Sequence, residues 1–97
     1  MPIVAFSTIF AVLADPQNTS LAGTIQAMYP GNFIQIRPGQ WLIAATGTAK
    51  DVSDTLMVSP DGGLGPAVIL AVSGYYGRAN NQIWEWLAAN MGKPTNA

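Results

Sequence analysis

The stretch from Pro66 to Met91 constrains the fold most, because a strand, a turn and a helix follow one another in it directly. The strand Ala67–Val72 is apolar at every position, so both of its faces need cover. The tryptophan-rich helix around Ile83–Leu87 begins only a short turn later, and can therefore only lie back against the same sheet. This succession predicts a layered α+β fold.

Three earlier segments complete the predicted order of elements. Ile3–Val12 is rich in β-branched and aromatic residues and has no helical polar face, which predicts a central strand. Apolar residues at helical spacing from Leu21 to Tyr29 predict the first helix. Thr48–Asp51 has the Ser/Thr-x-x-acid form that begins a helix, and so predicts the second. The last helix is expected to begin near Asn80 or Asn81.

Between the first two helices, Asn32–Thr46 predicts a hairpin whose turn is Arg37-Pro38-Gly39-Gln40. If Arg37 pairs with Gln40, one face of the hairpin is apolar. That face is predicted to hold Ile34, Ile36, Trp41 and Ile43. The other face mixes Phe33 and Leu42 with polar residues, which is typical either of a dimer seam or of a solvated sheet face.

The order strand, helix, strand, strand, helix, strand, helix matches a ferredoxin-like βαββαβ fold, with an antiparallel four-stranded sheet and an added C-terminal helix. One domain is expected to span residues 1–97. The two most apolar strands, Ile3–Val12 and Ala67–Val72, are expected to be its two central strands. Gly92 and Pro94 should end the last helix, so that residues 92–97 fray.

Charged residues make up only 9% of the chain, against about 25% in a typical soluble domain. Apolar surface left in water is unfavourable, so a chain this poor in charge is expected to hide surface against a partner. A homodimer or higher homo-oligomer is the simplest such arrangement. The alternative is a monomer whose surface is covered by uncharged polar residues.

Composition also excludes several classes of function. The four basic residues are scattered and the net charge is −1, so the basic stripe of a nucleic-acid-binding surface is missing. Histidine and cysteine are absent, and no cofactor or metal site of the usual kind is expected. The opening apolar run is shorter than the roughly 20 residues of a membrane span and has no preceding basic residue. We expect a cytoplasmic protein that does not enter a membrane.

Several loose motifs resemble those of a known group of proteins. They are Met1-Pro2 leading directly into a strand, Gln40-Trp41-Leu42-Ile43, and Ser73-Gly74-Tyr75-Tyr76-Gly77 followed by Trp86-Leu87. In these motifs the chain resembles small SinR-family bacterial proteins, which are similar in fold to the CRISPR-associated ferredoxin-like nucleases and to the VapD toxins. The likeness spans most of the chain.

The resemblance to the nucleases implies a carboxylate at the end of the first strand, where an Asp is implicated in holding a divalent metal. This chain has Ser7-Thr8-Ile9-Phe10 there, and its first carboxylate is Asp15. Asp51 and Asp54 lie three residues apart on the second predicted helix, where a shared cation is one interpretation and charges at a helix start are the other. No catalytic or metal-binding residue is therefore assigned.

The glycine-aromatic turn after Ala67–Val72 is the one place where a ligand site is predicted. It leads into the N-terminus of a helix, where free N–H groups favour an anion such as phosphate or a nucleotide. The candidate ligand-binding residues are Ser73, Gly74, Tyr75, Gly77, Arg78 and Asn80. The structural alternative is that the aromatic side chains pack under the turn.

Taken together, the residues favour a homo-oligomeric ferredoxin-like interaction or binding domain without catalytic activity. The alternative is a divalent-metal-dependent nuclease-like or nucleotide-binding protein of the same fold.

Overall fold

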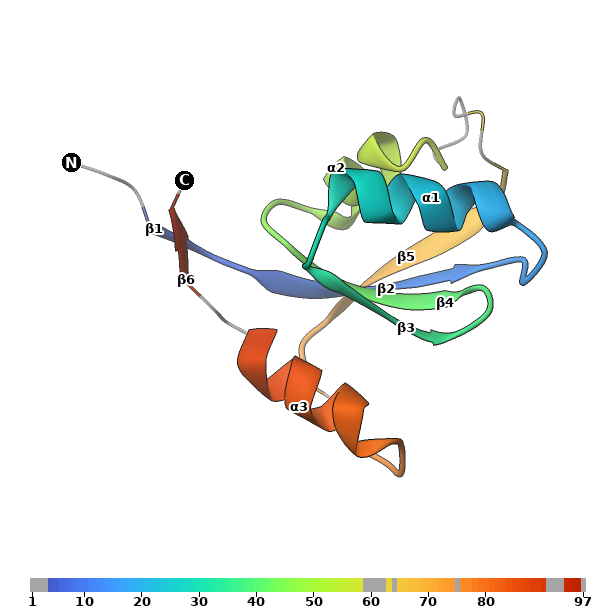
Figure 1. Cartoon of the computed structure of the whole chain (residues 1–97). Helices are drawn as coiled ribbons and strands as arrows, with labels where there is room; N and C mark the ends of the chain where they lie inside the picture. Colours follow the sequence, from blue (N-terminus) through green and yellow to red (C-terminus); the bar gives the residue numbers. More distant parts are fainter. Residues whose placement is uncertain (1–3, 59–62, 64, 75, 91–93, 97) are drawn as a thin grey trace.

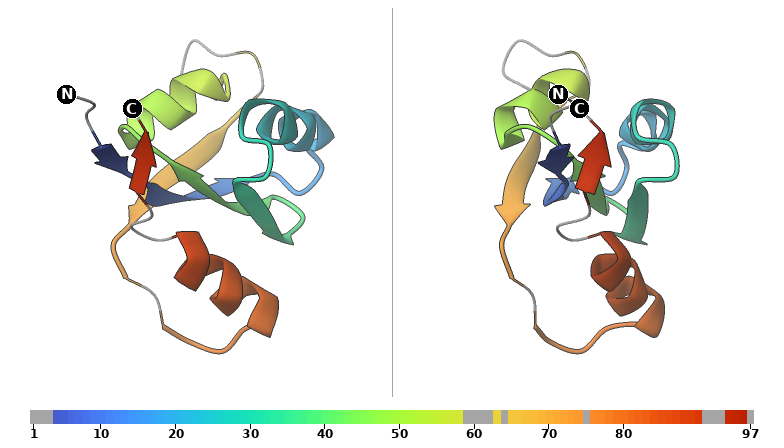
Figure 2. Two further views of the ribbon diagram at one scale, coloured as in Figure 1. Left: turned by 60° about the vertical axis from the view of Figure 1, so that its left-hand side comes forward. Right: turned by 90° about the vertical axis from the view of Figure 1, so that its left-hand side faces the viewer.

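The computed structural model describes residues 4–58, 63, 65–74, 76–90 and 94–96. In chain order these residues form β1 (Val4–Phe6), β2 (Thr8–Ala14), α1 (Thr19–Met28), β3 (Phe33–Arg37), β4 (Gln40–Ala45), α2 (Ala49–Thr55), β5 (Ala67–Val72), α3 (Asn81–Asn90) and β6 (Pro94–Asn96). Four of the strands form an antiparallel sheet in the order β3-β4-β2-β5. Helices α1 and α2 lie on one face of this sheet and α3 lies on the other (Figures 1 and 2). The predicted α+β architecture is confirmed.

The larger core lies between the sheet and the pair α1 and α2. Its buried side chains are Phe10, Val12, Leu21, Ile25, Trp41, Ile43, Val52, Leu56 and Val58. At the start of both helices, a side chain accepts a hydrogen bond from a backbone N–H that would otherwise be unpaired. Asn18 accepts the N–H of Leu21 at 3.2 Å, and Thr48 and Asp51 form a reciprocal capping box at the start of α2. The helix start predicted from Thr48–Asp51 is confirmed.

The smaller core lies between α3 and the opposite face of the sheet. Leu87 of α3 is buried there against Ile9, Leu42 and Ala44. The Ser7 hydroxyl donates a 2.6 Å hydrogen bond to the carbonyl of Asn90, the last residue of α3. This bond satisfies a C-terminal carbonyl that the helix itself leaves unpaired, and it ties the end of α3 to the strand region.

The first predicted strand differs from the observed one. Ile3–Val12 is divided at Ser7 into β1 and β2, and β2 continues to Ala14. β1 pairs with β6 in a separate two-stranded sheet. Pro94–Asn96, the strand β6, falls in the segment 92–97 for which the sequence predicts fraying. Local composition does not reveal it, because a three-residue strand is formed by its pairing partner rather than by its own residues.

The position of β5 is also corrected. β5 neighbours β2 as expected, but it is an edge strand rather than a central one. Helix α2 packs against it from one side. On the opposite face Val68 is 54% exposed and Leu70 is 48% exposed. The premise that an apolar strand has cover on both faces is met on the α2 face, but on the α3 face it is met only at Val72, which packs against the smaller core.

Arg37 pairs with Gln40 as predicted, but the prediction of which side chains share a face of the hairpin is wrong. A register shift between Gln35 and Arg37 inserts an extra residue, so that Ile34 lies opposite Leu42. A shift of one residue moves side chains to the other face of a sheet. Ile34 therefore packs with the α3 core, while Phe33 packs with the core under α1 and α2.

The turn of this hairpin approaches the end of β2 closely, and this contact can be tested by substitution. Gly39 has a φ of +83°, and a Cβ there would lie 2.5 Å from the carbonyl oxygen of Ala14. We expect Gly39→Ala to destabilise the protein by more than about 1 kcal/mol in urea unfolding. Gly31→Ala is the matched control, since Gly31 has a φ of +74° but open space around it. Equal losses in the two variants would contradict this account.

Candidate functional site

A hollow of about 290 Å³ lies where α3 and its preceding turn face the sheet. The sheet supplies Ile36, Leu42 and Val72, and the turn and α3 supply Tyr76, Gly77, Arg78, Ala79, Ile83, Trp84 and Leu87. Arg78 is the one charged residue among the described residues of this lining. The hollow thus combines an apolar wall with a single positive charge, an arrangement suited to a small molecule that carries both an apolar group and an anionic group.

The predicted ligand residues are only partly brought together. Gly77 and Arg78 line the hollow, whereas Ser73, Gly74 and Asn80 do not. Tyr75 lies outside the described residues. The sequence analysis did not find the sheet residues of the lining, since no local signal connects Ile36 or Leu42 with a turn almost forty residues later.

The start of α3 is occupied by its own cap. The Asn80 side-chain oxygen accepts the N–H of Gln82 at 2.9 Å, and the Asn80 carbonyl accepts the N–H of Ile83 at 3.0 Å. An anion held by the N–H of Gln82 would have to displace the Asn80 side chain, and the N–H of Ile83 is already bonded to the backbone. The hollow, rather than the bare helix terminus, is therefore the better candidate ligand site.

The acidic residues of α2 have structural partners. The Asp51 carboxylate accepts the N–H of Thr48 at 2.8 Å, and this hydrogen bond is the main cause that lowers the pKa of Asp51 below 3.8. Asp54 accepts a 2.8 Å hydrogen bond from Lys50, one turn earlier on the exposed face of the helix. Among the described residues, no group of three or more acidic side chains could hold a metal ion.

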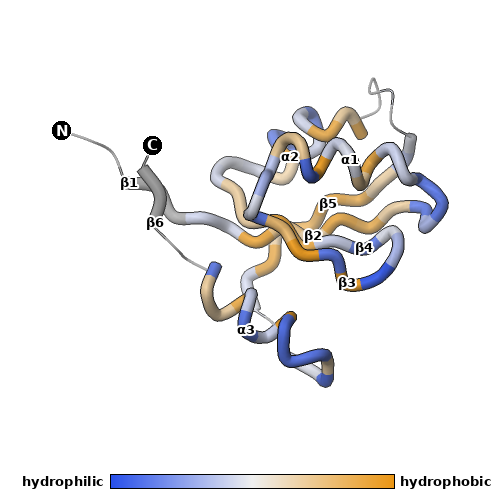
Figure 3. Tube along the Cα trace, viewed as in Figure 1, coloured by the Kyte–Doolittle hydropathy of each residue, from blue (hydrophilic) through white to orange (hydrophobic). Residues whose placement is uncertain are grey.

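A second feature is an apolar surface on the face of the sheet that α3 packs against. It consists of Leu13 on β2 with Val68 and Leu70 on β5, and we call it the β2–β5 surface. These three side chains are between 43% and 54% exposed. Figure 3 shows the hydrophobic colouring running along β5 to the edge of the sheet, whereas the outer end of β3 is hydrophilic.

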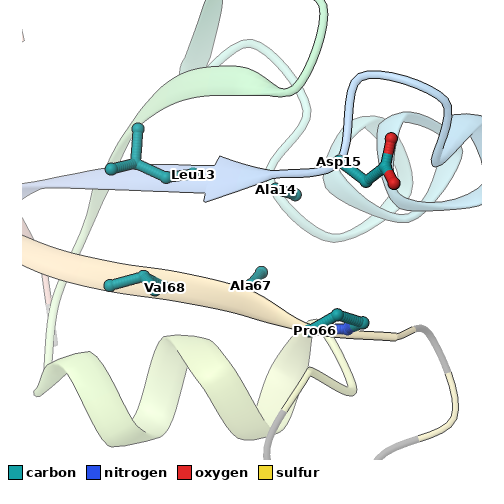
Figure 4. Close-up of a pocket in the computed structure, with 6 residues that line it drawn as sticks. All are labelled: Leu13, Ala14, Asp15, Pro66, Ala67 and Val68. Carbon is teal, nitrogen blue, oxygen red and sulfur yellow. The ribbon is translucent and has the colours of Figure 1, made fainter.

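One end of the β2–β5 surface forms a shallow hollow of about 340 Å³ (Figure 4). It is lined by Leu13, Ala14, Asp15, Pro66, Ala67 and Val68. Asp15, the one carboxylate among the described lining residues, accepts a hydrogen bond from the N–H of Gln17 at 2.9 Å, whereas the N-cap of α1 is Asn18. The remaining lining is apolar, so this end is better suited to packing than to binding a polar ligand.

Comparisons with family models, with curated proteins and with solved structures find no match. No helix in the described part of the chain combines the length and the apolar character needed to cross a membrane.

The Asp51 cap predicts a pH dependence of stability. Because the folded-state pKa of Asp51 lies below 3.8, its contribution is present above the unfolded-state value and is lost as the pH falls through the folded-state value. We expect the urea midpoint of the wild-type protein to fall on acidification from pH 5 to pH 3, and that of Asp51→Asn to fall less. Parallel pH profiles for the two proteins would refute this role.

Proposed function

We propose that the protein is a non-catalytic interaction domain that works by self-association. The observation that carries this proposal is the β2–β5 surface. Val68 and Leu70 remain about half exposed on a strand without a single polar side chain. Apolar area in water is unfavourable by about 25 cal/mol per Å². Only 9% of the chain's residues are charged, so few charged side chains are available to prevent this surface from contacting other copies of the chain.

The proposed fold is a ferredoxin-like βαββαβ unit with α3 added. The strand order supports this, because both βαβ units are split. β4 lies between β2 and β3, which α1 connects, and β2 lies between β4 and β5, which α2 connects. The proposed relation to the SinR-family proteins rests on this pattern and on the aromatic and glycine motifs of the sequence.

A second candidate function is binding of a small ligand in the hollow beside α3. The favouring observation is that Arg78, the one charged side chain in the described lining, lies beside an apolar wall that includes Trp84. A nucleotide, or another anion with an aromatic or aliphatic group, would place its charge near Arg78 and its apolar part against the sheet. The nuclease-like alternative gains no such support, since Asp51 is held in a cap and Asp54 is paired with Lys50.

Self-association can be tested by size-exclusion chromatography with light scattering. We expect the wild-type protein at micromolar concentration to have at least twice the 10.2 kDa mass of one chain. Leu70→Gln should weaken association by about tenfold or more, because it removes a large apolar side chain from the contact. Met28→Gln is the matched control, as Met28 is equally exposed, at 51%, on the other side of the sheet. A wild-type mass of one chain would end the proposal.

Ligand binding can be tested by titration with nucleotides, cyclic dinucleotides and inorganic phosphate, followed by tryptophan fluorescence and melting temperature. Any of these ligands that binds in the hollow should change the Trp84 signal and raise the melting temperature. Arg78→Gln should weaken that binding by about tenfold, since it removes the charge facing the anion. Lys50→Gln on α2 is the control and should leave binding unchanged. No response to any ligand would remove this candidate.

A further inference from the structure

We infer that two copies of the chain join edge to edge, with their β5 strands antiparallel and Ile69 on the two-fold axis between them. This inference rests on the proposed self-association and names the surface that forms it. It follows from the direction of the backbone groups of β5, from the contrast between the two edges of the sheet, and from the side chains of β5.

The direction of the backbone groups follows from one hydrogen bond. Ala14 donates its N–H to the carbonyl of Gly39 at 2.8 Å, so the backbone of Ala14 faces the β4 side of β2. In an antiparallel sheet successive residues of a strand face opposite neighbours. The backbone N–H and C=O groups of Leu13 therefore face β5, where Leu13 lies opposite Val68.

The same alternation continues along β5. Val68, Leu70 and Val72 direct their N–H and C=O groups to β2, since they lie opposite Leu13, Ala11 and Ile9 without any register shift. Ala67, Ile69 and Ala71 then direct theirs away from the sheet. Within the described ranges no strand pairs with β5 on that side, so β5 presents the donors and acceptors of three residues along an open edge.

The two edges of the sheet differ in how they are protected. β3 carries Gln35 and Arg37 and has a bulge between them, and polar side chains and bulges are devices that keep free edges from pairing. β5 has six apolar residues, no charge, no proline and a regular register. An edge of this kind is expected to be covered by another strand.

A second copy fits this edge because β5 matches itself. With Ile69 opposite Ile69 of the partner subunit, Ala67 lies opposite Ala71 of the partner subunit. The outward groups of the two strands then form about six hydrogen bonds. Val68 lies opposite Leu70 of the partner subunit, so the β2–β5 surfaces of the two copies become continuous. Because β5 has no ionised side chain, this pairing brings no like charges together.

The first test removes one of the outward N–H groups of β5 by substituting proline. In Ala71→Pro the ring blocks the edge but removes no hydrogen bond to β2, and the Ala71 side chain is exposed. We expect its dimerisation to be weaker than that of the wild type by about tenfold or more, with unchanged circular dichroism. Gln35→Pro is the matched control, because Gln35 occupies an exposed outward position on β3, and it should remain a dimer.

Amide hydrogen exchange of the wild-type protein gives a second test that needs no variant. Raising the concentration through the dimerisation range should protect the amides of Ile69 and Ala71, while those of Val68 and Leu70 are protected at every concentration. The Gln35 amide on the other edge should stay unprotected. Concentration-independent exchange at Ile69 and Ala71 in a dimeric sample would overturn edge pairing.

The outcomes separate the inference from the function on which it rests. A wild-type protein that is monomeric at every concentration overturns both. A dimer that survives Ala71→Pro but is weakened by Leu70→Gln overturns edge pairing alone, and shows instead that the β2–β5 surfaces stack face to face. Loss of the dimer in Ala71→Pro, with protection of the outward amides in the wild type, supports the inference.

Discussion

The structure depends on an imbalance between the two faces of one sheet. Among the described elements, the helices α1 and α2 cover one face, and α3 alone covers the other. α3 buries Leu87 against Ile9, Leu42 and Ala44 and is held at its C-terminal end by the Ser7 hydroxyl. A single ten-residue helix cannot cover four strands, because a helix with its side chains is only about 10–12 Å wide and neighbouring strands lie almost 5 Å apart. The part of the face that it leaves open is the β2–β5 surface.

Local sequence patterns predicted the elements well, because their causes are local. The cap of α2 is a reciprocal contact between Thr48 and Asp51, which are only three residues apart. The apolar character of β2 and β5 follows directly from the residues of each strand. The bulge between Gln35 and Arg37 was not predictable in this way. A bulge is decided by the partner strand and by the core that each face must fill, and one additional residue transfers Ile34 from one core to the other.

The candidate site was predictable only in part for the same reason. Gly77 and Arg78 belong to a turn whose composition marks it as unusual, whereas Ile36, Leu42 and Val72 complete the hollow through tertiary packing alone.

The prediction that failed most clearly, a central position for β5, is also the most informative. Where a sequence pattern disagrees with the fold, a functional site is expected, and an apolar strand with one exposed face is such a disagreement. An apolar strand at an edge fits a protein whose sheet continues into a second copy.

The two proposed surfaces are compatible with each other because they share only one strand, and at different residues. Edge pairing uses the outward groups of Ala67, Ile69 and Ala71. The hollow uses Val72, which lies opposite Ile9 and directs its backbone groups to β2. A ligand beside Arg78 would therefore leave the outward donors of β5 free, and pairing of β5 would leave the wall of the hollow in place. Coupling between ligand and partner then requires a movement of α3, whose end is held by Ser7.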